Sequence, residues 1–184
     1  IWGIDCDSMQ EALVKYLRAR KMTISAAESC TGGLVAKTIT NCAGASEVFE
    51  YGFTTYSNEA KVKLLGVNPE TIEQFGAVSE QTAVEMANGA RNVSGADIAV
   101  SVTGVAGPNA SEGKAVGTVC IGVATGEKAY ANTFLFAGSR AEIRKQSAKM
   151  ACKLVLSELG GLPSGEKITK RAVKTVKSIK NKIT

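Results

Sequence analysis

The sequence contains no histidine. Histidine is the side chain that proteins use most often as a general base, so the commonest way of activating a serine or cysteine nucleophile is excluded. If the protein carries out covalent catalysis, a lysine or a tyrosine must activate the attacking atom. This absence narrows the mechanism before any fold is considered.

The sequence also lacks the patterns of secreted, membrane and zinc-binding proteins. Its five cysteines form an odd set without a Cys-x-x-Cys pair, which argues against a disulfide framework and a thiolate zinc site. No stretch of about 18 apolar residues occurs, and no basic segment followed by an apolar core opens the sequence. We therefore expect a cytoplasmic protein with no membrane span, no metal and no cofactor.

The positive charge is concentrated at one end of the chain. Residues 162–184 hold seven basic residues and one acid, a net charge of +6, whereas the rest of the chain has a net charge of −1. A length of 184 residues with 45% hydrophobic content suits one domain. We expect that domain over residues 1–161 and a basic tail, helical or frayed, over 162–184. The alternative is a tail that binds nucleic acid or an acidic partner.

Helix and strand signals alternate along the domain. The last two strands are separated by Gly126 and Glu127 and can form an antiparallel hairpin. The order predicts an α/β fold, a three-layer α/β/α sandwich with a mixed, mainly parallel sheet and a late antiparallel hairpin. Counting capping residues, helices are expected at 9–20, 34–39, 57–65, 79–95 and 140–159, and strands at 23–27, 49–56, 98–102, 116–125 and 128–136.

A strand, a glycine turn and a helix are expected to meet at residues 28–33, which read Glu-Ser-Cys-Thr-Gly-Gly. Ser29, Cys30 and Thr31 are adjacent candidate nucleophiles, and the backbone amides at the start of a helix favour anions. The alternatives are that the Ser29 hydroxyl only caps the helix and that Cys30 is a buried core residue.

Two residues further along the chain could serve as the base. Lys61 is expected near the start of a helix, where the helix dipole and partial burial lower the pKa of an ammonium group. Tyr56, at the junction of strand and helix, could relay a proton or orient Lys61. The alternatives are an exposed Lys61 paired with Glu59 or Glu28, and a Tyr56 that is an ordinary aromatic residue at a sheet edge.

A second glycine-rich loop, at residues 103–108, and two arginines complete the candidate site. Thr103 and Gly104 could offer a hydroxyl and backbone amides to a ligand, although a simple turn explains the loop almost as well. Arg140 and Arg144 lie one helical turn apart, so they could contact one phosphate or carboxylate, or only solvent. Neither glycine loop matches the patterns of ATP- or NAD-binding loops.

Taken together, these residues resemble one known family, the C-terminal domain of the competence/damage-inducible CinA proteins, which also occurs alone as nicotinamide-nucleotide amidase. Six blocks span most of residues 8–160 in the family's order, which makes the resemblance specific. The blocks are AESCTGG (27–33), GFTTYSNEAK (52–61), GAVSE (76–80), TGVAGP (103–108), VGTV (116–119) and FAGSR (136–140).

The resemblance implies hydrolysis of the carboxamide of nicotinamide mononucleotide, which gives nicotinate mononucleotide and ammonia. It implies a serine/lysine dyad, with Ser29 as nucleophile, Lys61 as base and Tyr56 assisting. Backbone amides of the turn would stabilise the oxyanion, and an arginine would hold the substrate phosphate. The expected substrate-binding residues are Cys30, Thr31, Gly32, Gly33, Thr103, Gly104, Arg140 and Arg144. We also expect a homo-oligomer, with a dimer as the working assumption.

Three features depart from the family pattern. The family carries a glycine pair and a later Lys-Pro after Pro108, where this chain reads Asn-Ala-Ser-Glu-Gly-Lys-Ala at 109–115. The basic tail falls outside the resemblance. Residues 1–3 resemble a linker from an N-terminal CinA domain, so the chain could be a fragment. The altered loop motivates a second hypothesis, a catalytically silent nucleotide-binding domain that acts through partners in competence or DNA repair.

Overall fold

The computed structural model describes residues 8–161. The expectations for the linker-like start and for the basic tail concern residues 1–7 and 162–184 and lie outside this part of the chain. Helices and strands alternate within it, as predicted. The elements are α1 (Met9–Arg20), β1 (Ile24–Glu28), α2 (Leu34–Thr40), the 3-10 helix η1 (Ala45–Glu47), β2 (Phe49–Thr54), α3 (Asn58–Leu65), α4 (Pro69–Phe75), α5 (Glu80–Ser94), β3 (Ile98–Gly104), β4 (Thr118–Ala124), β5 (Ala129–Leu135) and α6 (Arg140–Glu158).

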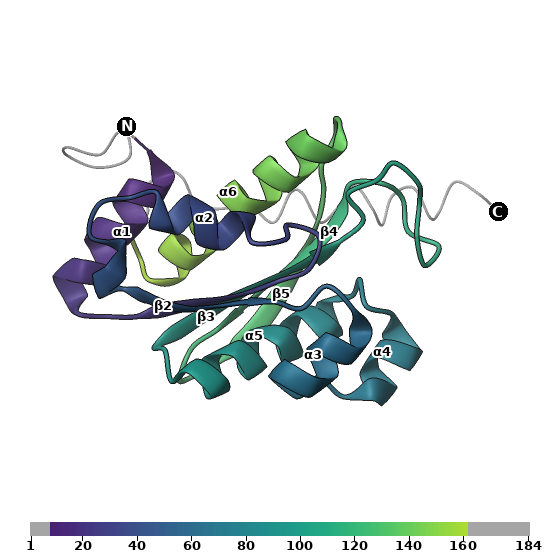
Figure 1. The fold of residues 1–184 in the computed structure, drawn as a ribbon, viewed down its shortest axis with the longest axis horizontal. Helices are drawn as coiled ribbons and strands as arrows, with labels where there is room; N and C mark the ends of the chain where they lie inside the picture. Colours follow the sequence, from purple (N-terminus) through teal and green to yellow (C-terminus); the bar gives the residue numbers. More distant parts are fainter. Residues whose placement is uncertain (1–7, 162–184) are drawn as a thin grey trace.

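The strands form one open sheet in the order β2-β1-β3-β4-β5 (Figure 1). Strand β1 pairs in parallel with both β2 and β3, whereas β4 pairs antiparallel with both β3 and β5. Four strands therefore point the same way and only β4 is reversed. The mixed sheet with a hairpin at its end confirms the predicted fold class.

Helices cover both faces of this sheet. Helices α1, α2 and α6 pack on one face, and α3, α4 and α5 form the layer on the other (Figure 1). The larger apolar core lies on the α6 side, where Leu17, Ile121 and Ile143 are buried together. A smaller core on the α5 side contains Leu65 and Met86. The three layers agree with the α/β/α prediction.

Polar side chains fix where several helices begin. The hydroxyl of Ser79 accepts a hydrogen bond from the Thr82 amide at the start of α5. At the start of α6, Ser139 and Glu142 form a complete capping box. Such contacts satisfy amides that have no partner within the helix, so the caps read from the sequence place the helix starts accurately.

Two short elements were not predicted from the sequence, and some strand ends differ. Helix α4 has no buried residue, so it lacks the apolar period that marks longer helices, although Asn68 caps it and Pro69 opens it. The 3-10 helix η1 is only three residues long. Strand β4 begins at Thr118 rather than at residue 116, because the preceding Gly117 has a φ of 92° and interrupts the extended backbone.

The parallel strands bring distant segments to one edge of the sheet. Glu28, the last residue of β1, lies opposite Thr54 of β2 and Val102 of β3. The chain segments that follow these three strands are therefore neighbours. Ligands bind at such carboxyl ends in many open α/β sheets.

Gly89 allows α5 to pack closely against α3, and its replacement tests this packing. A Cβ atom at this position would overlap the carbonyl group of Leu65, at the end of α3. We expect Gly89→Ala to lower the free energy of unfolding by about 1–3 kcal/mol, although alanine favours helices more than glycine does. Urea unfolding measures the change. The control Asn92→Ala, at an exposed position of the same helix, should stay within about 0.5 kcal/mol of the wild type.

Candidate functional site

The turn after β1 places Ser29 at the carboxyl edge of the sheet. The Ser29 amide donates to the carbonyl of Val102 in β3 at 2.9 Å, which extends the sheet pairing by one residue. The chain then turns through Gly32 and Gly33, whose φ values of 57° and 93° are in the left-handed region. Glycine adopts this conformation without steric cost, so the Gly-Gly pair permits the abrupt change from strand to helix.

The side chain of Lys61 reaches Ser29 from the layer below the sheet. Its Nζ lies 3.2 Å from the Ser29 Oγ, and both residues are buried, with Lys61 only 1% exposed and Ser29 9% exposed. The predicted pair is therefore in contact despite its separation in the sequence. An exposed Lys61 and a Ser29 that only caps the helix are not observed, because Lys61 is buried and the N-cap of α2 is Gly33. The alternative that Cys30 is a buried core residue is confirmed.

Backbone carbonyls hold the Lys61 amine in place. Nζ donates to the carbonyl of Thr55 at 3.0 Å and to those of Tyr56 and Ser57 at 3.4 Å. No carboxylate among residues 8–161 forms an ion pair with Lys61. Burial lowers the pKa of Lys61 below its ordinary value of 10.5, while the negative charge of Glu112 and the thiol of Cys30 act in the opposite direction. The lowered pKa favours the neutral amine that a general base requires.

The neighbouring candidates are less suited to act as nucleophiles. Burial raises the pKa of the Cys30 thiol to about 11, which keeps it protonated and unreactive. Thr31 is fully buried, and its hydroxyl has no hydrogen-bond partner among the described residues. Of the three adjacent candidates, only Ser29 contacts a base.

A buried acid, Glu28, caps the helix that follows the turn. Its carboxylate accepts hydrogen bonds from the amides of Gly33, Val35 and Ala36 at 2.8–3.0 Å. The amides at the start of α2 do bind an anionic group, as expected, but that group is a carboxylate of the protein itself and not a ligand. An acid directly before the turn is the one sequence signal for this cap, although its position equally fits an ion pair with Lys61.

The two arginines of α6 contact different groups. Arg144 donates from Nε to the carbonyl of Cys30 at 3.1 Å and from Nη2 to that of Thr31 at 2.7 Å. Arg140 donates to the carbonyl of Gly107 at 2.6 Å and to the hydroxyl of Tyr56 at 3.1 Å. Arg144 thus holds the turn at residues 29–33, which we call the nucleophile turn after its candidate nucleophile Ser29, whereas Arg140 connects two loops at its rim.

Tyr56 and the second glycine loop lie differently from what their proposed roles require. Tyr56 is 61% exposed, and its hydroxyl contacts Arg140 and not Lys61. The only Tyr56 group that Lys61 contacts is the backbone carbonyl. The buried hydroxyl of Thr103 donates to the carbonyl of Ala77 at 2.7 Å. A Cβ atom at Gly104 would lie 2.8 Å from the Thr118 carbonyl, so glycine is needed there for strand packing. Both residues therefore have structural partners.

The loop at 109–115, which departs from the family pattern, folds over the start of α5. The carboxylate of Glu112 accepts hydrogen bonds from the amides of Ala77 and Val78 at 3.3 and 3.1 Å. Lys114 lies 3.6 Å from the same carboxylate and donates to the carbonyl of Phe75. The loop therefore brings a negative charge close enough to influence Lys61, a feature not predicted from the sequence.

Within residues 8–161, no helix combines the length and apolar character needed to cross a membrane. The same part of the chain contains no cluster of three or more histidine, cysteine or acidic side chains that could hold a metal ion.

Comparison with known proteins places this site in a family. Residues 6–159 match the family model of the CinA C-terminal domain. The chain belongs to the CinA C-terminal domain family. A relative from Caldicellulosiruptor saccharolyticus, named among the competence-damage inducible proteins, is 52% identical over 152 residues, which cover 82% of this chain and 37% of the relative. The chain thus spans about two fifths of the length of such relatives.

Solved structures agree with this family. A competence or damage-inducible protein from Enterobacter asburiae is 34% identical, with a TM-score of 0.80 over 82% of this chain and 96% of that protein. The competence/damage inducible protein CihA from Agrobacterium tumefaciens is 37% identical, with a TM-score of 0.78 over 84% of this chain and 98% of that protein. The CinA fold therefore accounts for nearly the whole of these compact proteins.

The lowered pKa of Lys61 predicts a pH-dependent stability. The unfolded chain binds a proton at Lys61 up to about pH 10.5, but the folded chain loses that proton at a lower pH. The free energy of unfolding therefore rises with pH between the lowered pKa of the folded state and about 10.5. Relative to Lys61→Met, the free energy of unfolding of the wild type should therefore increase from neutral pH to about pH 10. Urea unfolding at several pH values measures this difference.

The control for this experiment is Lys63→Met, at an exposed position of the same helix. An exposed ammonium group is solvated in both the folded and the unfolded states, so this variant should follow the wild type at every pH. If the difference in the free energy of unfolding between the wild type and Lys61→Met also stays constant with pH, the inferred burial of the Lys61 charge is contradicted.

Proposed function

We propose that this domain is an amidohydrolase that removes ammonia from the carboxamide of nicotinamide mononucleotide. The observation that carries the proposal is the contact between the Lys61 Nζ and the Ser29 Oγ at 3.2 Å in a buried site. A lysine with a lowered pKa beside a serine is an arrangement that activates a nucleophile without histidine. The substrate is proposed from the family resemblance.

In the first half of the reaction, the neutral Lys61 amine accepts the proton of the Ser29 hydroxyl while the Oγ attacks the amide carbon. The tetrahedral intermediate collapses when the Lys61 ammonium returns this proton to the departing nitrogen, which leaves as ammonia. The product of this half is an ester between Ser29 and the nicotinate group. The carbonyls around Nζ would orient it through both proton transfers, because the neutral amine can donate its two hydrogens to them while its lone pair accepts the Ser29 proton.

In the second half, water hydrolyses this ester. Lys61 accepts a proton from the water, the resulting hydroxide attacks the ester carbon, and the proton returns to the Ser29 oxygen as the acyl group leaves as a carboxylic acid. This acid loses its proton to the released ammonia or to solvent, which gives nicotinate mononucleotide. The same base therefore serves both halves, and atoms and charges balance without a metal or a cofactor.

The amides available for an oxyanion are fewer than the sequence predicted. Glu28 occupies the Gly33 amide, and the Gly32 amide donates to the Ser29 carbonyl at 3.0 Å. The amides of Cys30 and Thr31 have no acceptor among the described residues. They are therefore the proposed donors to the negative oxygen of the tetrahedral intermediate.

Arg140 is the better candidate for the substrate phosphate. Arg144 is committed to the carbonyls of the nucleophile turn, whereas the exposed Arg140 retains guanidinium N–H groups beyond the two that contact Gly107 and Tyr56. Tyr56 would then assist by orienting this guanidinium, instead of relaying a proton to Lys61.

Ammonia release from nicotinamide mononucleotide tests the proposal. Ser29→Ala should reduce kcat by at least about 1,000-fold, because the nucleophile is lost, and Lys61→Ala by at least about 100-fold, because the base is lost. Cys30→Ala should keep most of the activity, because the thiol is buried and protonated while the backbone amide remains. Wild-type protein that releases no ammonia would favour the catalytically silent nucleotide-binding domain.

The pH dependence of the reaction tests the influence of the altered loop on Lys61. Since the negative charge of Glu112 raises the pKa of Lys61, Glu112→Gln should move the rising limb of the pH profile of kcat/KM to lower pH. Glu59→Gln is the control, because Glu59 is exposed two residues before Lys61 in the same helix. Equal shifts in both variants would show that Glu112 has no particular influence on the base.

A further inference from the structure

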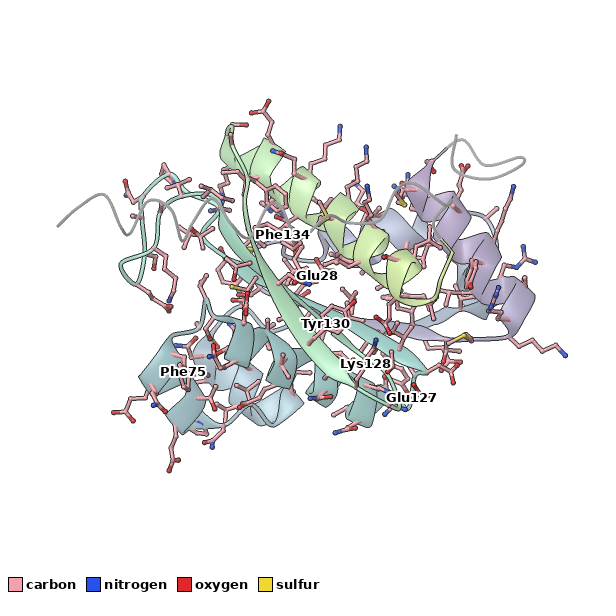
Figure 2. The ribbon with its side chains drawn as sticks, turned by 180° about the vertical axis from the view of Figure 1, so that it is seen from behind. Glu28, Phe75, Glu127, Lys128, Tyr130 and Phe134 are labelled. Atoms are coloured by element: carbon pink, nitrogen blue, oxygen red, sulfur yellow. The ribbon has the colours of Figure 1, made fainter. Side chains whose placement is uncertain are left out.

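Glu28 is an acid in an unusual position. It is only 2% exposed, it lies near the middle of the molecule in Figure 2, and no described basic side chain forms an ion pair with it. Burying a carboxylate is costly unless hydrogen bonds replace its hydration. The presence of this buried acid directly before Ser29 therefore calls for a reason beyond filling the core.

The hydrogen bonds of Glu28 connect strand β1 to helix α2 on the other side of the nucleophile turn. Oε2 accepts from the amides of Gly33 and Val35 at 3.0 and 2.9 Å, and Oε1 accepts from Ala36 at 2.8 Å. The Glu28 backbone is held in the sheet, where its carbonyl accepts from the Thr55 amide at 2.8 Å. Both ends of the turn are thus anchored through one residue.

Arg144 holds the same turn from the opposite direction. Glu28 engages amide groups at the end of the turn, whereas Arg144 engages the carbonyls of Cys30 and Thr31. The turn lies between an anionic acceptor and a cationic donor, so its peptide groups have little freedom to rotate. Ser29 is the first residue of this restrained segment, and its side chain must meet Lys61.

We propose that Glu28 is a positioning residue that fixes the nucleophile turn so that the Ser29 hydroxyl stays directed at Lys61. This inference rests on the proposed function, because it takes Ser29 to be the nucleophile. The carboxylate also keeps external anions from the start of α2. The oxyanion and the substrate phosphate must therefore use other donors.

The test replaces the carboxylate with an amide of the same shape. In Glu28→Gln the new NH2 group faces backbone N–H donors and cannot accept from them, so the turn loses part of its restraint. We expect kcat for ammonia release to fall about 10- to 100-fold while KM changes less than about threefold, because a small misplacement of the reacting atom affects the chemical step most.

A second measurement follows Ser29 without the nucleotide substrate. The rate at which a fluorophosphonate probe modifies Ser29 reports the reactivity of the hydroxyl, and it should fall by a factor similar to that of kcat. If Glu28→Gln does not fold, Glu28→Asp serves instead, because its shorter carboxylate keeps the charge but cannot reach the same three amides. Its probe rate should also fall.

Glu85→Gln is the matched control. Glu85 accepts hydrogen bonds from the Asn68 amide and the Thr71 hydroxyl near α4, so it supports a helix start elsewhere in the molecule. Both variants should lose thermal stability, but only the Glu28 variant should lose probe reactivity when both are assayed well below their unfolding temperatures. A Glu28 variant that is folded, less stable and fully reactive would overturn the positioning role and leave only a structural one.

The wild-type protein separates this inference from the proposed function. If it reacts with the probe at Ser29 but releases no ammonia from nicotinamide mononucleotide, the proposed substrate is wrong and the probe rates of the variants still decide the role of Glu28. If Ser29 of the wild type does not react with the probe and no ammonia is released, both proposals fail, because there is no nucleophile to position.

Discussion

The site depends on the burial of one lysine amine against one serine hydroxyl. Lys61 is the largest fully buried side chain of the described residues, although an ammonium group is strongly hydrated in the unfolded chain. Three backbone carbonyls just before α3 surround its Nζ, and Gly89 lets α5 pack closely against the end of α3. The burial of Lys61 in this layer lowers the pKa of its amine.

In the nucleophile turn too, backbone hydrogen-bonding groups are engaged by side chains. An amide that holds the turn in place cannot also stabilise an oxyanion, so under the proposed mechanism these two tasks fall to different residues. Glu28 takes the amides at the start of α2, Arg144 takes the carbonyls of Cys30 and Thr31, and the amides of those two residues are left over. The groups that restrain the turn are thus different from those that the proposed mechanism leaves to bind an oxyanion.

The fold was predictable from the sequence because its signals are local, whereas the site was only partly predictable. Serine caps and glycine stops mark α3 and α5, and the hairpin follows from a two-residue turn, but α4 lacks the apolar period that would reveal it. No spacing rule states that Glu28 reaches the amides of α2 or that Thr103 is committed to Ala77. Such partners depend on which segments the sheet brings together, and that information is not local.

The loop at 109–115, where the sequence indicates a departure from the family pattern, also affects the electrostatic environment of Lys61. Its residues leave Ser29 and Lys61 in contact, so the departure does not remove the dyad. Glu112, seated on the amides of Ala77 and Val78, instead places a negative charge that opposes the effect of burial on the pKa of Lys61. If the dyad is catalytic, this loop changes the pH range over which the lysine is a base, and sequence differences there adjust the reaction without altering the residues that perform it.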